Sequence, residues 1–383
     1  MRVPALRPGS AEQRIDESIH RGWAPDPGRV AEVVASDAAR LGSVGVESAR
    51  TALTSEVLGL GPLQECVDDV AVTDVLVNGD GSVWVDRGAG LERSAVALAD
   101  AGAARRLAVR LAGVAGRRLD ESQPWVDGLL PGGLRLHAVL PPLVDGGAHL
   151  SLRVARVRSD GLGALQRRGM FDEPMGRVLE ALVARRCSYL VTGGTGCGKT
   201  TVLAAMLAQV PASERIVVVE DVRELSVSHP HVVRLQGRGA NVEGRGAVTL
   251  VDLVRQALRM RPDRLVVGEV RGAEVREMLA ALNTGHEGGC GTVHANAAAD
   301  LPARLEALGA LAGLGSEAVA LQASSALQAV VHLTREHGRR RVESISVVRG
   351  GARGVECVLA FDTMGPVSDG WPLLVDLLGQ DPR

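Results

Sequence analysis

Residues 193–201 read Gly193-Gly194-Thr195-Gly196-Cys197-Gly198-Lys199-Thr200-Thr201, and they stand between an apolar run and a helical pattern. The apolar run, Ser188–Thr192, predicts a strand, and Lys199–Gln209 predicts the helix after it. Glycines at this spacing let successive backbone N–H groups turn toward one anion, and the start of the helix adds the positive end of its dipole. In this Gly-x-x-x-x-Gly-Lys-Thr pattern, Lys199 reaches the β- and γ-phosphates and the Thr200 hydroxyl binds Mg²⁺. The stretch therefore predicts a loop that binds a nucleoside triphosphate with Mg²⁺.

Lys199 is the only lysine in the chain, so 42 of the 43 basic residues are arginine. An ammonium group on a flexible stem is compact, whereas a guanidinium group is planar and wide. Every other basic residue in this sequence is arginine. The one exception indicates a place where the compact cation is required, and it lies inside the predicted phosphate-binding loop.

Two further predicted strands end in acids. One leads into Glu269, and the other ends at Glu220 and Asp221. The carboxyl ends of parallel strands meet at one edge of a sheet, where a metal-linked or water-activating acid belongs beside such a loop. We expect Glu269 to act as general base and to bind Mg²⁺ with Thr200 and Asp221. Glu220 is the alternative base, and helix capping or a loop ion pair is the structural alternative for Glu220 and Asp221.

Two histidines follow in a glycine-rich segment. His286 lies in a predicted turn, and His294 ends a short predicted strand. Imidazoles in such places can sense a γ-phosphate and pass its state to a neighbouring subunit, although lone histidines are often structural. The spacing of His286, Cys290 and His294 also raises the possibility of zinc. We do not expect zinc, because the intervening glycines break any helix that would align these side chains and no fourth ligand is evident.

The patterns around the loop predict two domains. From residue 171 to 383, strands alternate with helices, which indicates a parallel sheet flanked by helices, with a hairpin around Gly338 at its end. Residues 51–155 mix short strands with one helix, Ala101–Ala115, and predict a small α+β domain. Residues 156–170 are rich in Arg, Gly and Ser and predict a linker. Residues 1–50 predict a leader that is helical or partly mobile.

The predicted elements follow from hydrophobic periodicity and turn signals, including the hairpin turn at Asn78-Gly79-Asp80-Gly81. In the small domain the predicted strands are Val72–Asn78, Ser82–Asp86, Leu134–Leu140 and His149–Val154. In the larger domain the predicted strands are Ser188–Thr192, Arg215–Glu220, Arg264–Val270, Gly291–His294, Val330–Thr334 and Val342–Val348, and the predicted helices are Glu173–Arg186, Lys199–Gln209, Leu250–Met260, Ala273–Leu282, Leu301–Leu311 and Ser316–Leu327.

Composition excludes several classes of protein. A chain of 383 residues with 46% hydrophobic and 23% charged residues is typical of a folded protein of about two domains. A net charge of -2 argues against a protein that coats nucleic acid, and 2% aromatic residues leave few rings to stack on bases. The five scattered cysteines fit a reducing compartment. No apolar run is long enough to span a membrane and no secretion signal is visible, so we expect a cytoplasmic protein without direct membrane insertion.

Taken together, these stretches resemble the secretion and pilus-assembly ATPases of type II and type IV systems, in particular the Tad/Flp pilus-assembly or conjugal-transfer-associated branch. The resemblance runs from about Gly59 to Val348 and is densest over Arg255–Gly272 and Asn283–Asn296. It implies an α/β fold with a RecA-like P-loop NTPase domain and a smaller N-terminal α+β domain. It also implies ATP and Mg²⁺ as cofactors, a homo-oligomer of hexameric form, and a platform protein in the inner membrane as partner.

The resemblance also implies roles for single residues. Glu220 and Asp221 belong to the family's aspartate box, Glu269 is its Walker B acid, and His286 and His294 form its histidine box. In the family, basic residues of the smaller domain approach the phosphates, and Arg135 and Arg153 stand at the matching places. The sequence departs from the family pattern before Arg135, where Asp127–Gly133 lacks the usual Arg and Asp, and at His137, where Asn is usual.

The function predicted from these features is Mg-dependent ATP hydrolysis by a ring-forming motor that powers pilus assembly or protein secretion. We expect the motor to associate with the inner face of the cell membrane through its partners. The alternative is a nucleic-acid motor, such as a conjugal DNA-transfer ATPase or a helicase, which arginine runs such as Arg339-Arg340-Arg341 leave open. A small-molecule kinase would have no use for the aspartate- and histidine-box stretches.

Overall fold

The computed structural model describes residues 59–88, 90–154, 161–239, 245–336, 338–351 and 354–382. The chain divides into two compact units, Met1–Arg156 and Val157–Arg383. Each unit has its own sheet and its own hydrophobic core. The predicted leader, residues 1–50, lies outside the described residues.

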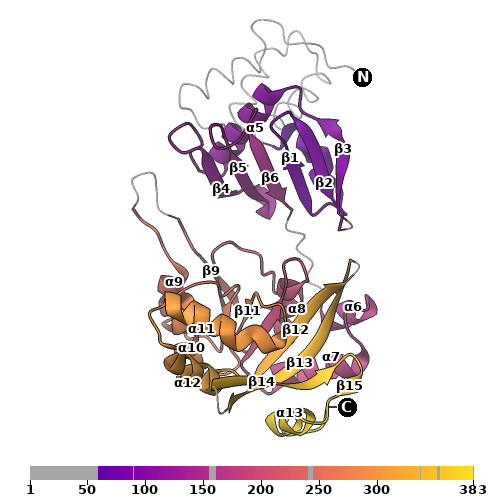
Figure 1. The fold of residues 1–383 in the computed structure, drawn as a ribbon, viewed down its shortest axis with the longest axis vertical. Coiled ribbons are helices and arrows are strands. Elements are labelled where there is room, and N and C mark those ends of the chain that lie inside the picture. The colour runs from indigo at the N-terminus through magenta and orange to yellow at the C-terminus, as the bar shows by residue number, and fades with distance from the viewer. Residues whose placement is uncertain are drawn as a thin grey trace, which may run out of the picture. The chain divides into compact units, whose positions relative to one another are not determined.

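The N-terminal unit is an antiparallel sheet with helix α5 (Ala101–Val114) packed on β5 and β6 (Figure 1). The Asp100 side chain caps α5 by accepting a hydrogen bond from the backbone N–H of Ala103, which fixes where the helix begins. The sheet has six strands in the order β3-β2-β1-β6-β5-β4. The other elements are η1 (Gly61–Leu63), α4 (Gln64–Asp68), β1 (Asp74–Val77), β2 (Ser82–Asp86), β3 (Leu91–Ala97), β4 (Trp125–Leu129), η2 (Pro131–Gly133), β5 (Arg135–Val139) and β6 (His149–Arg153).

Alternation along β5 and β6 gives this sheet one apolar and one polar face. Leu136 and Leu152 are buried in the core, so Arg135 and Arg153, their neighbours along each strand, point to the other face. Arg135 and Arg153 are also direct partners in the pairing of β5 with β6. The two predicted phosphate-binding arginines are therefore neighbours on the polar face of the N-terminal sheet.

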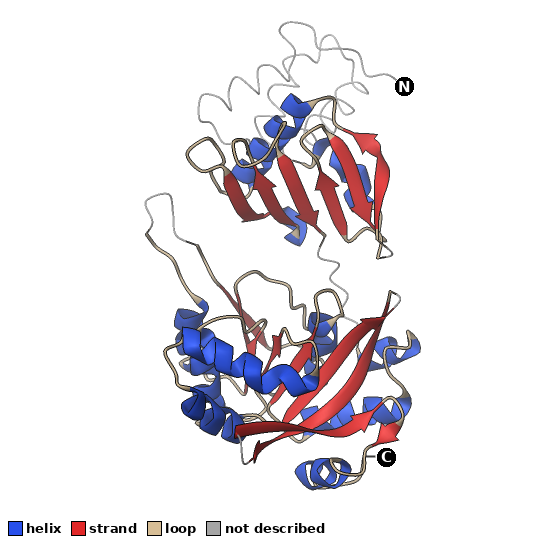
Figure 2. Ribbon diagram, in the orientation of Figure 1, coloured by secondary structure: helices blue, strands red, loops and turns tan. Residues whose placement is uncertain are grey.

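The second unit is a nine-stranded sheet with helices on both faces (Figure 2). The strand order is β15-β14-β13-β12-β7-β11-β10-β8-β9, of which β12 to β9 run parallel and β13 to β15 antiparallel. The strands are β7 (Tyr189–Gly193), β8 (Ile216–Glu220), β9 (Val232–Gln236), β10 (Arg264–Val267), β11 (Cys290–Val293), β12 (Ala329–Glu336), β13 (Arg339–Gly351), β14 (Gly354–Asp362) and β15 (Gly365–Pro366). The helices are α6 (Leu162–Arg167), α7 (Glu173–Ala184), α8 (Lys199–Leu207), α9 (Leu250–Leu258), α10 (Glu274–Leu282), η3 (Ala298–Asp300), α11 (Leu301–Leu311), α12 (Ser316–Ala326) and α13 (Trp371–Leu378).

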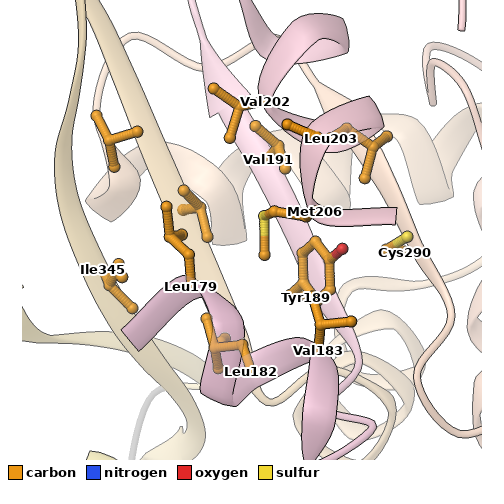
Figure 3. Packing of buried hydrophobic residues seen from close by; sticks show 14 of the residues in the cluster. Leu179, Leu182, Val183, Tyr189, Val191, Val202, Leu203, Met206, Cys290 and Ile345 are labelled. Atoms are coloured by element: carbon orange, nitrogen blue, oxygen red, sulfur yellow. The ribbon is translucent and has the colours of Figure 1, made fainter. Parts of the chain in front are cut away.

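Two apolar clusters hold this sheet between its helices. Val218 of β8 belongs to the cluster shared with α6, α7, α8 and α13, while Val217 and Val219 belong to the cluster shared with α9 to α12. Figure 3 shows the first cluster, in which Tyr189 of β7 packs with Met206 of α8 and with side chains of α7. Because β7 is buried on both faces, packing holds its last residue in place, and this residue is the first of the loop.

The structure confirms the predicted parallel sheet flanked by helices and the hairpin around Gly338. It adds strands that the sequence did not predict, namely β3, β4, β9, β14 and β15, most of them near the sheet edges, where the burial pattern is mixed. It also differs at the predicted linker. Leu162 and Leu165 are buried and form helix α6, which contacts α7 and α8, so this part of residues 156–170 belongs to the second unit.

A buried ion pair ties β10 to the start of β8, and its loss is expected to destabilise the second unit. Arg264 is 1% exposed, and its Nε donates to Glu214 Oε2 over 2.6 Å. The Glu214→Ala variant leaves a buried guanidinium without its carboxylate, which costs about 3 kcal/mol. Urea denaturation of the variant and of Glu173→Ala, which removes the exposed Glu173–Arg177 pair, checks this. The surface variant is expected to lose less than about 1 kcal/mol, and equal losses would contradict the assignment.

Candidate nucleotide-binding site

The carboxyl edge of the parallel strands gathers most of the predicted site residues. β7 leads into the loop of residues 193–201, β11 into His294, β10 into Glu269, and β8 into Glu220 and Asp221. These four strands are consecutive neighbours in the sheet, in the order β7-β11-β10-β8. The loop, the imidazole and the acids therefore lie along one edge.

The loop leads into the start of α8, which has no side-chain cap. Helices α5, α7 and α9 each begin with a side-chain cap, whereas α8 has none, and the residue before it, Gly198, has a φ of 99°. A Cβ on Gly193 would lie 2.3 Å from the carbonyl oxygen of Leu333, so only glycine fits where β7 turns into the loop. Gly194 and Thr195 are exposed, and Thr200 and Thr201 are half-buried in the first turn of the helix. The N–H groups in the first turn of a helix have no acceptor within the helix, so this turn favours an anion.

Lys199 lies under this loop and is only 7% exposed. Its Nζ donates to the carbonyl oxygens of Gly193 and Gly194, each over 2.9 Å. Nζ is also 3.3 Å from Nδ1 of His294. An ammonium group has only donors, so Nδ1 of His294 accepts this hydrogen bond.

His294 links the lysine to the acid of β10. With Nδ1 accepting, the ring proton is on Nε2, which donates to Glu269 Oε1 over 2.9 Å. Burial, and next the charge of Lys199, lower the pKa of His294, which favours this neutral form. Glu269 remains partly exposed, with 38% of its side-chain surface accessible. The arrangement leaves a carboxylate that faces solvent and is coupled through one imidazole to the lysine of the loop.

Arg271 joins the acids of two strands, and the sequence reasoning gave it no role. It forms ion pairs with Asp221 and, over 3.8 Å, with Glu269. The backbone N–H groups of Arg271 and Gly272 both donate to the buried Glu274 carboxylate, which fixes the turn after β10. The signal that could have found Arg271 is a basic residue two positions after a predicted strand-end acid.

Glu220 is enclosed and differs in this from Glu269. It is 4% exposed, and its Oε1 accepts hydrogen bonds from the backbone N–H groups of Glu224 and Leu225. A Cβ on Gly268 would lie 2.5 Å from Cγ of Glu220, so this side chain packs against the end of β10. Its Oε2 has no hydrogen-bond partner among the described residues. Glu220 therefore braces β8 against β10, and Glu269 is the acid open to water.

Burial raises the pKa of Glu220 above its ordinary value of 4.5, which predicts a pH-dependent effect of Glu220→Gln on stability. Because the raised pKa belongs to the folded state, ionising Glu220 costs folding free energy as the pH rises above the ordinary value. Glutamine stays neutral, so the variant is expected to gain stability relative to the wild type as the pH rises above the ordinary value of 4.5. Thermal unfolding at several pH values checks this, and a difference that does not change with pH would contradict it.

The structure does not bring His286 to the other site residues within one chain. His286 precedes β11 and His294 follows it, and the strand between them spans about 10 Å. The His286 side chain makes no hydrogen bond or ion pair with any residue that the structure describes. Cys290 is buried within β11, and no group of three or more His, Cys, Asp or Glu side chains suits a metal ion in the described ranges. Among the described residues, His286 and Cys290 therefore do not join His294 in such a group.

The residues present do fit Mg²⁺ in the way usual beside a bound nucleotide. Mg²⁺ prefers hard oxygen ligands and takes most of them from water and phosphate, so it needs only one or two protein oxygens. The Thr200 hydroxyl and the Glu269 carboxylate are such oxygens, on the loop and at the end of a nearby strand. Asp221 lies farther along the edge and is held by Arg271.

Comparison with known proteins shows which family this chain belongs to. A family model described as "Type II/IV secretion system protein" matches residues 56–358. A "Putative conjugal transfer protein" of Mycobacterium tuberculosis is 52% identical over 345 residues, which are 88% of this chain and 98% of the relative. The conjugal transfer protein TrbB of Rhizobium radiobacter is 31% identical over 296 residues, or 75% of this chain and 87% of the relative.

Solved structures share the fold. The pilus retraction motor PilT, solved with bound ADP, has a TM-score of 0.54 and 22% identity, covering 83% of this chain and 85% of PilT. The ATPase DotB of Legionella pneumophila has a TM-score of 0.53 and 19% identity, covering 74% of this chain and 79% of DotB. Among the described residues, none of the helices is long and apolar enough to cross a membrane. The family match over most of the chain and the two sequence relatives show that this chain belongs to the type II/IV secretion system protein family.

Proposed function

We propose that this chain binds ATP at residues 193–201 and hydrolyses it as the motor of a secretion, pilus or conjugal-transfer system. The observation that carries the proposal is the line of contacts from the loop carbonyls through Lys199 and His294 to Glu269. It couples a phosphate-binding cation to an acid that is open to water. Membership of the secretion family supports a motor that does mechanical work on other proteins.

Each residue has a distinct part in the proposed reaction. Lys199 neutralises charge on the β- and γ-phosphates, while the amides from Gly196 to Thr201 hold the phosphate chain. Glu269 accepts the proton of the attacking water, and His294 orients its carboxylate. Thr200 and Glu269 would hold Mg²⁺, which would supply positive charge to stabilise the charge developing in the transition state. The sequence also predicts roles in the site for Asp221, His286, Arg135 and Arg153, and these roles stay predictions.

We further propose that the chain works as a homo-oligomer, a hexamer, on the cytoplasmic face of a membrane through a platform protein. Proteins of similar sequence are named for conjugal transfer and for type IV secretion, which supports a membrane-bound machine as the partner. Mass photometry with and without a non-hydrolysable ATP analogue tests the assembly. A ring that forms with the analogue supports the proposal, and a monomer under all conditions would contradict it.

A motor that acts directly on nucleic acid is not favoured. The net charge is -2 and aromatic side chains are scarce, so neither a basic surface nor a stacking platform is well supplied. Steady-state ATP hydrolysis, measured with and without single-stranded DNA at two salt concentrations, tests the proposal and this rival together. Hydrolysis that is independent of DNA supports the secretion motor. Stimulation by DNA that falls steeply with salt would favour the rival, and the absence of any hydrolysis would contradict both.

A further inference from the structure

The hairpin of β12 and β13 extends beyond the sheet edge beside the phosphate loop (Figure 1). β12 pairs in parallel with β7, and the last partners are Leu333 and Gly193, the residue at which the loop begins. The three residues that follow Leu333 therefore run alongside the loop. This brings a second segment, far from the loop in sequence, to the same place.

Two arginines of this hairpin lie against the glycines of the loop. A Cβ on Gly196 would lie 3.4 Å from Nη1 of Arg335, and a Cβ on Gly198 would lie 3.5 Å from Cδ of Arg340. Because both loop positions are glycine, the arginine side chains rest on bare backbone. Both arginines are exposed at this end of the hairpin, so a ligand that enters the loop can reach them.

Arg335 and Arg340 are direct partners in the pairing of β12 with β13, so they share one face of the hairpin. Like charges in this position repel each other and destabilise the pairing. An anion between them would offset the repulsion, and the amides of the loop already favour an anion beside them. The next pair, Glu336 with Arg339, joins opposite charges and faces the other side. The repulsive pair is thus the one that lies on the loop.

The order of strands indicates which part of the nucleotide these arginines meet. β12 lies on one side of β7, while β11 and β10, which carry His294 and Glu269, lie on the other. Glu269 must reach the water that attacks the terminal phosphate, so the γ-phosphate lies toward β11. The remainder of the nucleotide then extends toward β12.

We propose that Arg335 and Arg340 bind the diphosphate part that ADP and ATP share. The inference rests on the proposed binding of nucleotide at residues 193–201. The two arginines contribute affinity for both nucleotides, whereas Lys199, His294 and Glu269 act on the γ-phosphate. Since charge-assisted hydrogen bonds are among the strongest polar contacts, losing one arginine is expected to weaken binding about tenfold.

Isothermal titration of ADP and of a non-hydrolysable ATP analogue, both with Mg²⁺, tests the inference. The variants are Arg335→Gln, Arg340→Gln and the double variant, with Arg339→Gln as a matched control on the other face of the same hairpin. Each site variant is expected to bind both nucleotides about tenfold more weakly, with a larger loss in the double variant. The control is expected to stay within about twofold of the wild type, because it removes an equal charge from the same segment away from the loop.

Thermal unfolding separates binding from folding in the same proteins. The site variants are expected to melt near the wild-type temperature without nucleotide, since both arginine side chains are exposed. Arg335→Lys and Arg340→Lys, which keep the charge, are expected to recover part of the affinity. Wild-type affinity in the site variants, a loss for the ATP analogue alone, or an equal loss in Arg339→Gln would overturn the inference. If the wild type bound neither nucleotide, the proposed function itself would fail.

Discussion

The Lys199→Ala variant is expected to lose ATP hydrolysis by at least about 100-fold. The buried ammonium group is the only lysine side chain in the molecule, and its contacts with Gly193, Gly194 and His294 place it at the centre of the loop. Removing it takes away the cation that neutralises the β- and γ-phosphates in the transition state. A coupled assay of phosphate release at saturating ATP measures the loss.

The Lys199→Arg variant tests whether a positive charge alone is sufficient at this position. It keeps the charge but replaces a compact group by a wide planar one in a place that is 7% exposed, so we expect it to be nearly as inactive as the alanine variant. The Lys199→Ala variant is expected to stay folded, because Lys199 is not part of the hydrophobic clusters on either side of the sheet. Full turnover in a folded Lys199→Ala protein would refute the site assignment.

The Glu269→Gln variant is expected to lower kcat by about 100- to 1000-fold while ATP still binds. Glutamine is nearly the same size and can still accept a hydrogen bond from Nε2 of His294, but it cannot take a proton from water. The phosphate loop is unchanged, so the variant should hold ATP without turning it over. Single-turnover kinetics together with equilibrium binding of ATP separate the two effects.

The matched comparison is Glu220→Gln. The Glu220 side chain is buried, and its Oε1 accepts hydrogen bonds from the backbone N–H groups of Glu224 and Leu225. The Glu220→Gln substitution is therefore expected to lower kcat far less than Glu269→Gln. The reverse order of losses would move the role of general base to Glu220. Equal and small losses in both variants would show that neither carboxylate accepts the proton.

The elements around the loop could be predicted because their signals are local. The apolar runs of β7, β8 and β10 are buried on both faces, and such runs stand out in a sequence without any knowledge of their neighbours. Edge strands such as β9 and β3 alternate weakly, since one side of each faces water, and they were not predicted. The sequence predicts a linker at helix α6 because this helix is short and its ends are rich in glycine and arginine.

The site was predictable only where its residues follow directly from strand ends. Lys199, Glu269 and His294 come together because β7, β11 and β10 are neighbours in the sheet. The contacts of Arg271, and of Arg335 and Arg340 with the loop, depend on which strands pair and in what register, which no local pattern reveals. His286 shows the converse, because nearness in sequence to His294 does not place it at the same edge.

A structure of the protein determined with Mg²⁺ and a non-hydrolysable ATP analogue puts the whole account to the test. We predict that the triphosphate lies in the turn of residues 193–201, with Nζ of Lys199 moved from the carbonyl oxygens of Gly193 and Gly194 onto the β- and γ-phosphates. Glu269 should then face the terminal phosphate through a water molecule. A triphosphate bound elsewhere, with Lys199 still on those two carbonyl oxygens, would contradict the account.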